Sequence, residues 1–129
     1  MGLDSNVVIR YAVRDDEDQA GRADAVVDGL SADSPGYVSL VVLTETWWVL
    51  DRAYAIARDR RLEFFEALLD AQELRTASPD LVRAALRRTR RGADFADALI
   101  TEASAAAGCT RVMTLDERAA KHAGMTLIT

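Results

Sequence analysis

The fold class can be predicted from the segment Gly36-Tyr37-Val38-Ser39-Leu40-Val41-Val42-Leu43-Thr44-Glu45. Residues 36–39 predict a brief strand, and residues 40–57 predict a long apolar helix that follows it directly. The same alternation recurs outward in both directions. Further strands are predicted at 1–4, 74–77, 110–114 and 126–128, and helices are predicted from Val7, from the acidic run 15–18, at 59–72, from Pro79, at 94–107 and at 117–122. Short apolar strands that alternate with helices favour an α/β fold with a short central parallel sheet flanked by helices.

Length and composition limit the class of protein. The chain has 129 residues, and we expect one domain over residues 1–129. It contains no uncharged apolar run of about 18 residues, and its start lacks the features of a signal peptide, so we expect a soluble, cytoplasmic protein. The single cysteine, Cys109, excludes an internal disulfide, and the single histidine, His122, excludes a two-histidine zinc site. We expect Cys109 to begin a buried strand and His122 to be solvated near the end of its helix.

Charge is unevenly distributed along the sequence. The 16 basic and 21 acidic residues give a formal charge of −5, which argues against a broad basic surface for nucleic acid. Residues 81–93 nevertheless contain five arginines and no acid, and Arg52, Arg58, Arg60 and Arg61 form a second cluster. Each cluster is either a solvated helix face or a phosphate contact, and the sequence leaves both interpretations open.

Four acids lie at unusual positions. Asp4 and Asp116 follow predicted strands, at the sheet edge where α/β proteins bind ligands. Glu45 is the only charge between residues 40 and 50, and Asp97 shares a face of an Ala-rich helix with Asp94; both settings predict burial. Converging carboxylates without His or thiolate favour Mg²⁺ or Mn²⁺, which can activate water and neutralise a phosphate. Taken singly, each Asp at a helix start is better explained as a cap than as a ligand, and pairing with an arginine is an alternative for Glu45.

These segments resemble the motifs of a known family. The opening Leu3-Asp4-Ser5-Asn6 is similar to the first motif of PIN-domain ribonucleases, closest to the VapC-type toxins of type II toxin–antitoxin systems. The later motifs follow in the family's order, at Val41-Val42-Leu43-Thr44-Glu45, Asp94-Phe95-Ala96-Asp97-Ala98-Leu99-Ile100 and Val112-Met113-Thr114-Leu115-Asp116. The match runs along nearly the whole chain and implies a PIN-like α/β/α sandwich.

The resemblance also implies a site and a reaction. It assigns catalytic and metal-binding roles to Asp4, Glu45, Asp97 and Asp116, with Asp94 as an additional acid, and supporting roles to Ser5, Asn6 and Thr114. It implies a Mg²⁺-dependent endoribonuclease, a hydrolase that uses Mg²⁺ or Mn²⁺ to cut RNA and leaves a 5′-phosphate and a 3′-hydroxyl. Candidate RNA contacts are Arg10, Arg87, Arg88, Arg90 and Arg91.

Partners follow from the same resemblance. VapC-type toxins form homodimers and are inhibited by a VapB-type antitoxin that covers the acidic site. Trp47 and Trp48 are adjacent on one helix and point about 100° apart, so one lies under an interface or both line the interior of the monomer. Two other functions stay open: a PIN-domain nuclease for RNA maturation without an antitoxin, and a non-catalytic Mg²⁺-binding α/β interaction domain. A phospho-accepting receiver of that second kind needs a lysine near its site, and the only lysine is Lys121.

Overall fold

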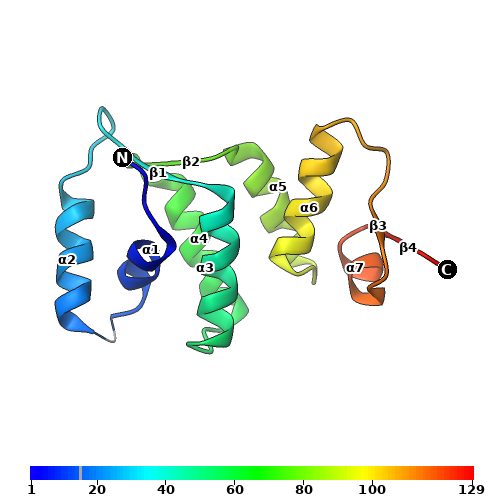
Figure 1. Cartoon of the computed structure of the whole chain (residues 1–129), viewed down its shortest axis with the longest axis horizontal. Coiled ribbons are helices and arrows are strands. Elements are labelled where there is room, and N and C mark those ends of the chain that lie inside the picture. Colours follow the sequence, from blue (N-terminus) through cyan, green and yellow to red (C-terminus); the bar gives the residue numbers. More distant parts are fainter. Residues whose placement is uncertain (15) are drawn as a thin grey trace. The chain divides into compact units, whose positions relative to one another are not determined.

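The computed structural model describes residues 1–14 and 16–129 of the chain (Figure 1). Asp15, part of the acidic run predicted to open a helix, lies outside the described residues. The chain forms two compact units, Met1–Ala77 and Ser78–Thr129, and each is described by itself. We refer to them as unit 1 and unit 2.

Unit 1 combines four helices with a short parallel ladder. Its elements, in chain order, are α1 (Ser5–Ala12), α2 (Glu17–Asp28), β1 (Gly36–Val38), α3 (Leu40–Arg52), α4 (Arg58–Asp70) and β2 (Leu74–Thr76). Strands β1 and β2 pair in parallel, with Gly36 opposite Leu74. The predicted strand 1–4 is reduced to a parallel bridge between Gly2 and Tyr37, because Asp4 already caps α1 and leaves too few residues for a longer strand.

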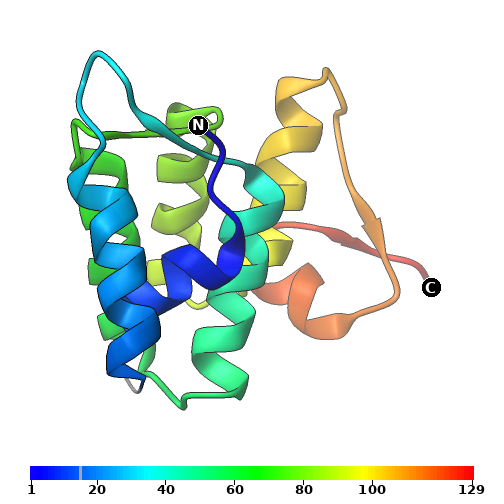
Figure 2. The same ribbon diagram turned by 60° about the vertical axis from the view of Figure 1, so that its left-hand side comes forward.

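The helices of unit 1 pack around one apolar core. Helix α1 contacts both α2 and α3, and α4 packs against β2 (Figure 2). Trp47 is 4% exposed and meets the edge of the Phe65 ring at a centroid distance of 5.4 Å. Its neighbour Trp48 is 59% exposed, which confirms that the two indoles do not share one buried stripe. The largest fully buried side chains of the unit include Phe65, Leu43, Leu50 and Val38.

The corner between α3 and α4 differs from the sequence prediction. Helix α3 ends at Arg52 and not at residue 57, because Ala55 adopts a left-handed conformation (φ 52°) that a helix cannot continue. The turn directs the Ile56 carbonyl to Arg61, whose Nε donates a hydrogen bond to it at 2.9 Å. Arg61 is only 7% exposed; its guanidinium carbon lies 4.2 Å from the Trp47 ring centroid, and its Nη2 lies 3.7 Å from Asp51 Oδ1. Both interpretations of the second arginine cluster are therefore wrong for Arg61, which holds this corner together.

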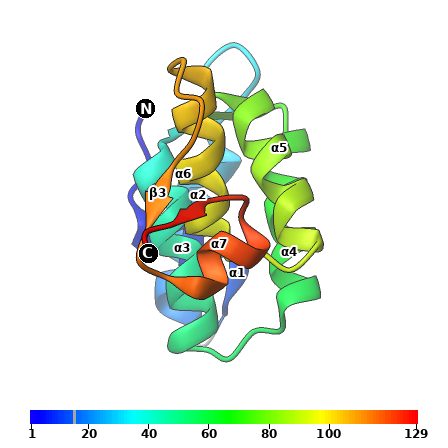
Figure 3. The same cartoon turned by 90° about the vertical axis from the view of Figure 1, so that its right-hand side faces the viewer.

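Unit 2 consists of a helix pair and a small βαβ element. Its elements are α5 (Pro79–Arg90), α6 (Phe95–Ala106), β3 (Met113–Thr114), α7 (Glu117–His122) and β4 (Thr126–Leu127). Pro79 occupies the first turn of α5, as predicted, and Gly108 (φ 93°) directly follows the cap of α6. Helices α5 and α6 pack closely against each other, and α7 packs against β3 and β4 (Figure 3). Val82, Leu86 and Phe95 of the helix pair are fully buried.

The predicted strand 110–114 is shorter and more exposed than expected. Only Met113 and Thr114 form a strand, Met113 is 46% exposed, and Cys109 is exposed instead of opening a buried strand. The strand is short because β4 pairs only with Met113 and Thr114. His122 is exposed in the last turn of α7, as expected.

Strand pairing confirms the α/β fold class. Within the described residues the strands form two ladders, β1–β2 and β3–β4, and both are parallel. Each parallel pair is connected through helices, as parallel strands require. No helix in the described part of the chain is long and apolar enough to cross a membrane.

Candidate functional site

Asp4, Ser5 and Glu45 form a hydrogen-bonded cluster in unit 1. Asp4 caps α1, and its Oδ1 accepts a hydrogen bond from the Ser5 amide at 2.7 Å. The Ser5 hydroxyl donates to Glu45 Oε1 at 2.6 Å and lies 3.4 Å from Asp4 Oδ1. A serine hydroxyl has one proton, and the shorter contact directs it to Glu45. Ser5 therefore joins two carboxylates that are 41 positions apart in the sequence, because it ties the start of α1 to α3.

Glu45 is exposed, so the prediction of a buried carboxylate is wrong. Helix α3 turns Leu43, Thr46, Trp47 and Leu50 toward the core. At 100° per residue, position 45 falls about 150° from the centre of this buried stripe, on the opposite side of the helix. The carboxylate is thus fixed by Ser5 on one side while it remains accessible to a ligand.

The remaining supporting and basic residues of unit 1 lie on α1. Asn6 is exposed in the first turn of the helix, not in a loop. Asn6 and Arg10 both line a groove of about 290 Å³ between α1 and α2.

Asp94, Asp97 and Asp116 form the acidic cluster of unit 2. Asp94 caps α6 and accepts the Asp97 amide at 3.3 Å, while Asp116 caps α7 and accepts the Arg118 amide at 2.8 Å. Asp97 is half-buried, and this burial raises its pKa, with further increases from the charges of Asp94 and Asp116. The negative charges of Asp94 and Asp116 therefore both act on Asp97 within a single unit. Thr114 Oγ1 accepts the Asp116 amide at 3.0 Å and orients the turn that carries this acid.

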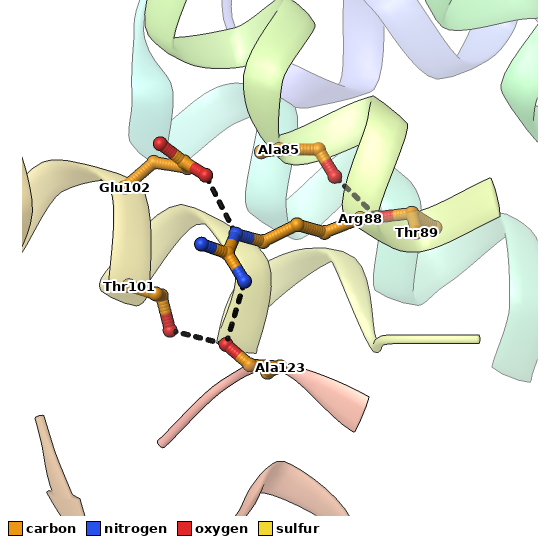
Figure 4. Close-up of polar contacts among 6 residues, drawn as sticks. All are labelled: Ala85, Arg88, Thr89, Thr101, Glu102 and Ala123. Atoms are coloured by element: carbon orange, nitrogen blue, oxygen red, sulfur yellow. Dashed lines mark hydrogen bonds and ion pairs between the residues drawn. The ribbon is translucent and has the colours of Figure 1, made fainter. Parts of the chain in front are cut away.

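Arg88 differs from the other arginines of α5. Its Nε donates a hydrogen bond to Glu102 Oε1 at 2.6 Å, and its Nη1 lies 3.4 Å from the Ala123 carbonyl, which also accepts the Thr101 hydroxyl (Figure 4). Arg88 thus links α5, α6 and the end of α7. Arg87, Arg90 and Arg91 are exposed. Glu102 could not be predicted as the partner of Arg88, because the two residues meet only when α5 and α6 pack.

The predicted acids thus fall into two sets, each brought together within its own unit: Asp4 with Glu45, and Asp94 with Asp97 and Asp116. Both sets offer only carboxylate oxygens, which is the donor chemistry of Mg²⁺ and Mn²⁺. Among the described residues, however, no group of three or more His, Cys, Asp or Glu side chains has a geometry that could hold a metal ion. The donor types fit a hard divalent cation, and such a cation would relieve the repulsion of the Asp97 charge by Asp94 and Asp116.

Comparison with known proteins identifies the class. Residues 1–125 match the PIN domain family, and the chain belongs to that family. PIN domains are typically metal-dependent nucleases that act on RNA. The predicted recognition of a PIN domain is confirmed at this level. No curated protein matches the chain.

Proposed function

We propose that this protein is a Mg²⁺-dependent endoribonuclease toxin that hydrolyses RNA phosphodiester bonds and is neutralised by a VapB-type antitoxin. The observation that carries the proposal is the state of the motif acids. Ser5 holds Glu45 beside Asp4, and burial together with the charges of Asp94 and Asp116 raises the pKa of Asp97. A helix cap needs only one carboxylate, so capping does not explain why Glu45 lies beside Asp4 or why Asp97 lies near Asp94 and Asp116. Charge repulsion that is retained in a folded protein marks a functional site more often than a structural one.

Four acids are proposed to bind the metal and to act in catalysis: Asp4, Glu45, Asp97 and Asp116, with Asp94 as an additional ligand. A bound divalent cation supplies a Lewis acid that lowers the pKa of water and neutralises a phosphodiester. Ser5 keeps the Glu45 carboxylate in one orientation, and Thr114 keeps the Asp116 turn in place. Asp4 can serve as cap and ligand together, because its contacts use Oδ1.

The substrate contacts are proposed to be arginines. Arg87, Arg90 and Arg91 lie on or next to the last turn of α5, three to seven residues before Asp94 in the sequence, and Arg10 lines the α1–α2 groove. Exposed guanidinium groups bind phosphates without reading sequence, which suits the backbone of RNA. Arg88 is a weaker candidate, since Glu102 already engages it.

We further propose that residues 1–129 act as a single domain, that the toxin is a homodimer, and that it works in the cytoplasm. Two observations would support the toxin role over an RNA-maturation role. Induced expression should arrest growth, and the Asp4→Asn variant should not. A small overlapping upstream reading frame with a DNA-binding N-terminus should encode the antitoxin.

The direct test of the activity is incubation of the purified protein with structured RNAs in Mg²⁺. Cleavage should stop in EDTA and in the Asp97→Asn variant. Activity that persists under either condition would rule out the proposed chemistry.

A further inference from the structure

One face of helix α3 is exposed along its whole length. Val41, Glu45, Trp48 and Arg52 follow one another at intervals of three or four residues, so they form a single stripe on the helix. We call this set the α3 stripe. Val41 is 74% exposed and Trp48 is 59% exposed, and Glu45 and Arg52 are exposed as well. The stripe therefore places an accessible indole one helical turn from an acid of the proposed site.

Arg52 lies over the Trp48 ring. Its guanidinium carbon is 5.8 Å from the ring centroid, within the range of a cation–π interaction, and its Nε is 3.9 Å from Asp51 Oδ2. Trp48 makes no other ring contact with the described residues. With 59% of Trp48 exposed, much of the indole surface is accessible to a ligand beside Arg52.

Trp47 provides the contrast within the same helix. It is buried against Phe65, and Arg61 lies 4.2 Å from its ring centroid. Trp47 therefore fills the aromatic position in the hydrophobic core. Burial does not explain why its neighbour is also a tryptophan, because Trp48 faces away from the core.

An exposed aromatic ring with an adjacent arginine is the arrangement with which proteins hold single-stranded nucleic acid. Bases stack on the ring, and the cation attracts the backbone phosphate. A paired base in an A-form duplex cannot offer its face to such a ring, so the ligand must be unpaired.

We propose that Trp48 is a stacking platform for an unpaired nucleobase of the RNA substrate and that Arg52 contacts an adjacent phosphate. This inference rests on the proposed ribonuclease function, because it states how that substrate is held beside Glu45. Trp48 and Arg52 are positioning residues for RNA and not metal ligands.

Fluorescence provides the test, because the two indoles differ in exposure. Short single-stranded RNA of mixed sequence is titrated into the full-length protein in EDTA, so that no cleavage occurs. We expect RNA to quench the Trp48 part of the emission and to leave the buried Trp47 emission unchanged. Trp48→Phe should abolish the quenching and retain most of the affinity, since phenylalanine still stacks. Trp48→Ala should weaken binding about 5- to 100-fold.

Matched controls separate stacking from other effects. Val41→Ala alters the same stripe without an aromatic ring and should leave RNA affinity unchanged. Arg52→Ala should weaken binding and reduce the slope of log affinity against log salt by about 1. Thermal unfolding of each variant checks that it folds. Duplex RNA of the same sequence should not quench Trp48.

The inference is overturned if Trp48→Ala binds single-stranded RNA as tightly as the unaltered protein, or if duplex RNA quenches equally. It is also overturned if light scattering shows that Trp48→Ala converts a dimer to a monomer, since the indole would then lie between two copies of the chain. Quenching without cleavage in Mg²⁺ would refute the ribonuclease proposal and leave stacking intact. Cleavage with an unchanged KM in Trp48→Ala would do the reverse.

Discussion

Ser5 Oγ donates a hydrogen bond of 2.6 Å to Glu45 Oε1 and so fixes an exposed carboxylate from a buried hydroxyl. This contact connects the first and second sequence motifs, and it gives the hydroxyl at position 5 a specific task. The task is orientation, because the serine proton points to Glu45 and the same side chain lies beside Asp4.

Loss of this hydroxyl should reduce catalysis more than stability. We expect Ser5→Ala to lower kcat for RNA cleavage about 10- to 100-fold, the usual effect of removing a group that orients a metal ligand. Ser5→Thr keeps the hydroxyl and should retain most of the activity. Ser34→Ala, which removes an exposed loop hydroxyl, is the control. Equal activity of Ser5→Ala and Ser34→Ala would show that Ser5 does not orient Glu45 for catalysis.

Replacing Asp97 with asparagine should lower activity and raise stability. Its pKa is raised by burial and by the charges of Asp94 and Asp116, so the folded protein binds a proton at Asp97 more tightly than the unfolded chain does. Stability is then lost as the pH rises from below the ordinary value of 3.8 through the raised pKa. At neutral pH without divalent ions, Asp97→Asn should raise the melting temperature.

The size and pH dependence of this effect provide the check. Solvent screens the half-buried Asp97, and the α6 N-terminus partly favours its charge, so we expect a gain of less than about 1 kcal/mol. The gain should vanish at about pH 3, where the carboxyl is protonated. The same variant should lose at least about 100-fold in activity. A lower melting temperature at neutral pH would contradict the electrostatic explanation.

Alanine variants of Arg88 and Arg87 should differ: loss of Arg88 should mainly reduce stability, and loss of Arg87 should mainly reduce RNA binding. Arg88→Ala removes the 2.6 Å contact with Glu102 and should destabilise the fold by about 1 kcal/mol, since both side chains are partly exposed. Arg87→Ala should change the free energy of unfolding by no more than about 0.5 kcal/mol. It should instead weaken RNA binding and lower its salt slope by about 1. Urea unfolding and RNA titrations at several salt concentrations measure both effects, and identical profiles for the two variants would refute this division.

Removing the hydroxyl of Thr46, which is next to Glu45 in α3, should stabilise the protein. Its hydroxyl is buried and has no hydrogen-bond partner among the described residues. Thr46→Val replaces it with a methyl group of similar size and should stabilise the protein by about 1 kcal/mol. Thr89→Val is the matched control, because Thr89 is equally buried but its hydroxyl donates to the Ala85 carbonyl at 2.9 Å. That control should not be stabilised. A Thr46→Val protein that unfolds at lower urea would show that the hydroxyl is satisfied in solution.

Local signals in the sequence predicted much of the fold. Pro79 at the start of α5, Gly108 after α6 and the caps Asp4, Asp94 and Asp116 depend on backbone chemistry within a few residues, and the structure contains all of them. The length and burial of the strand at 110–114 were wrong because they depend on distant pairing partners. The end of α3 was wrong because the left-handed Ala55 carries no Gly or Asn signal.

The sequence names the candidate acids, whose role in a site stays a prediction, but it does not predict their contacts. Motif order pointed to the five acids, and spacing placed Asp94 and Asp97 on one helix. The exposure of Glu45 depends on which face of α3 packs against the core, and residues 40–50 have too many apolar side chains all round the helix for their pattern to decide this. The hydrogen bond from Ser5 to Glu45 and the pairing of Arg88 with Glu102 are tertiary contacts, which a single sequence does not reveal.

Cleavage of RNA by the purified protein is the most direct test of the proposed metal-dependent ribonuclease activity. Structured RNA is incubated in Mg²⁺ with the unaltered protein and with Asp97→Asn, each with and without EDTA, and the 5′ ends of the fragments are mapped. Fragments with 5′-phosphates should appear only with the unaltered protein in Mg²⁺. Intact RNA under that condition, or equal cleavage in EDTA or by Asp97→Asn, would contradict the account.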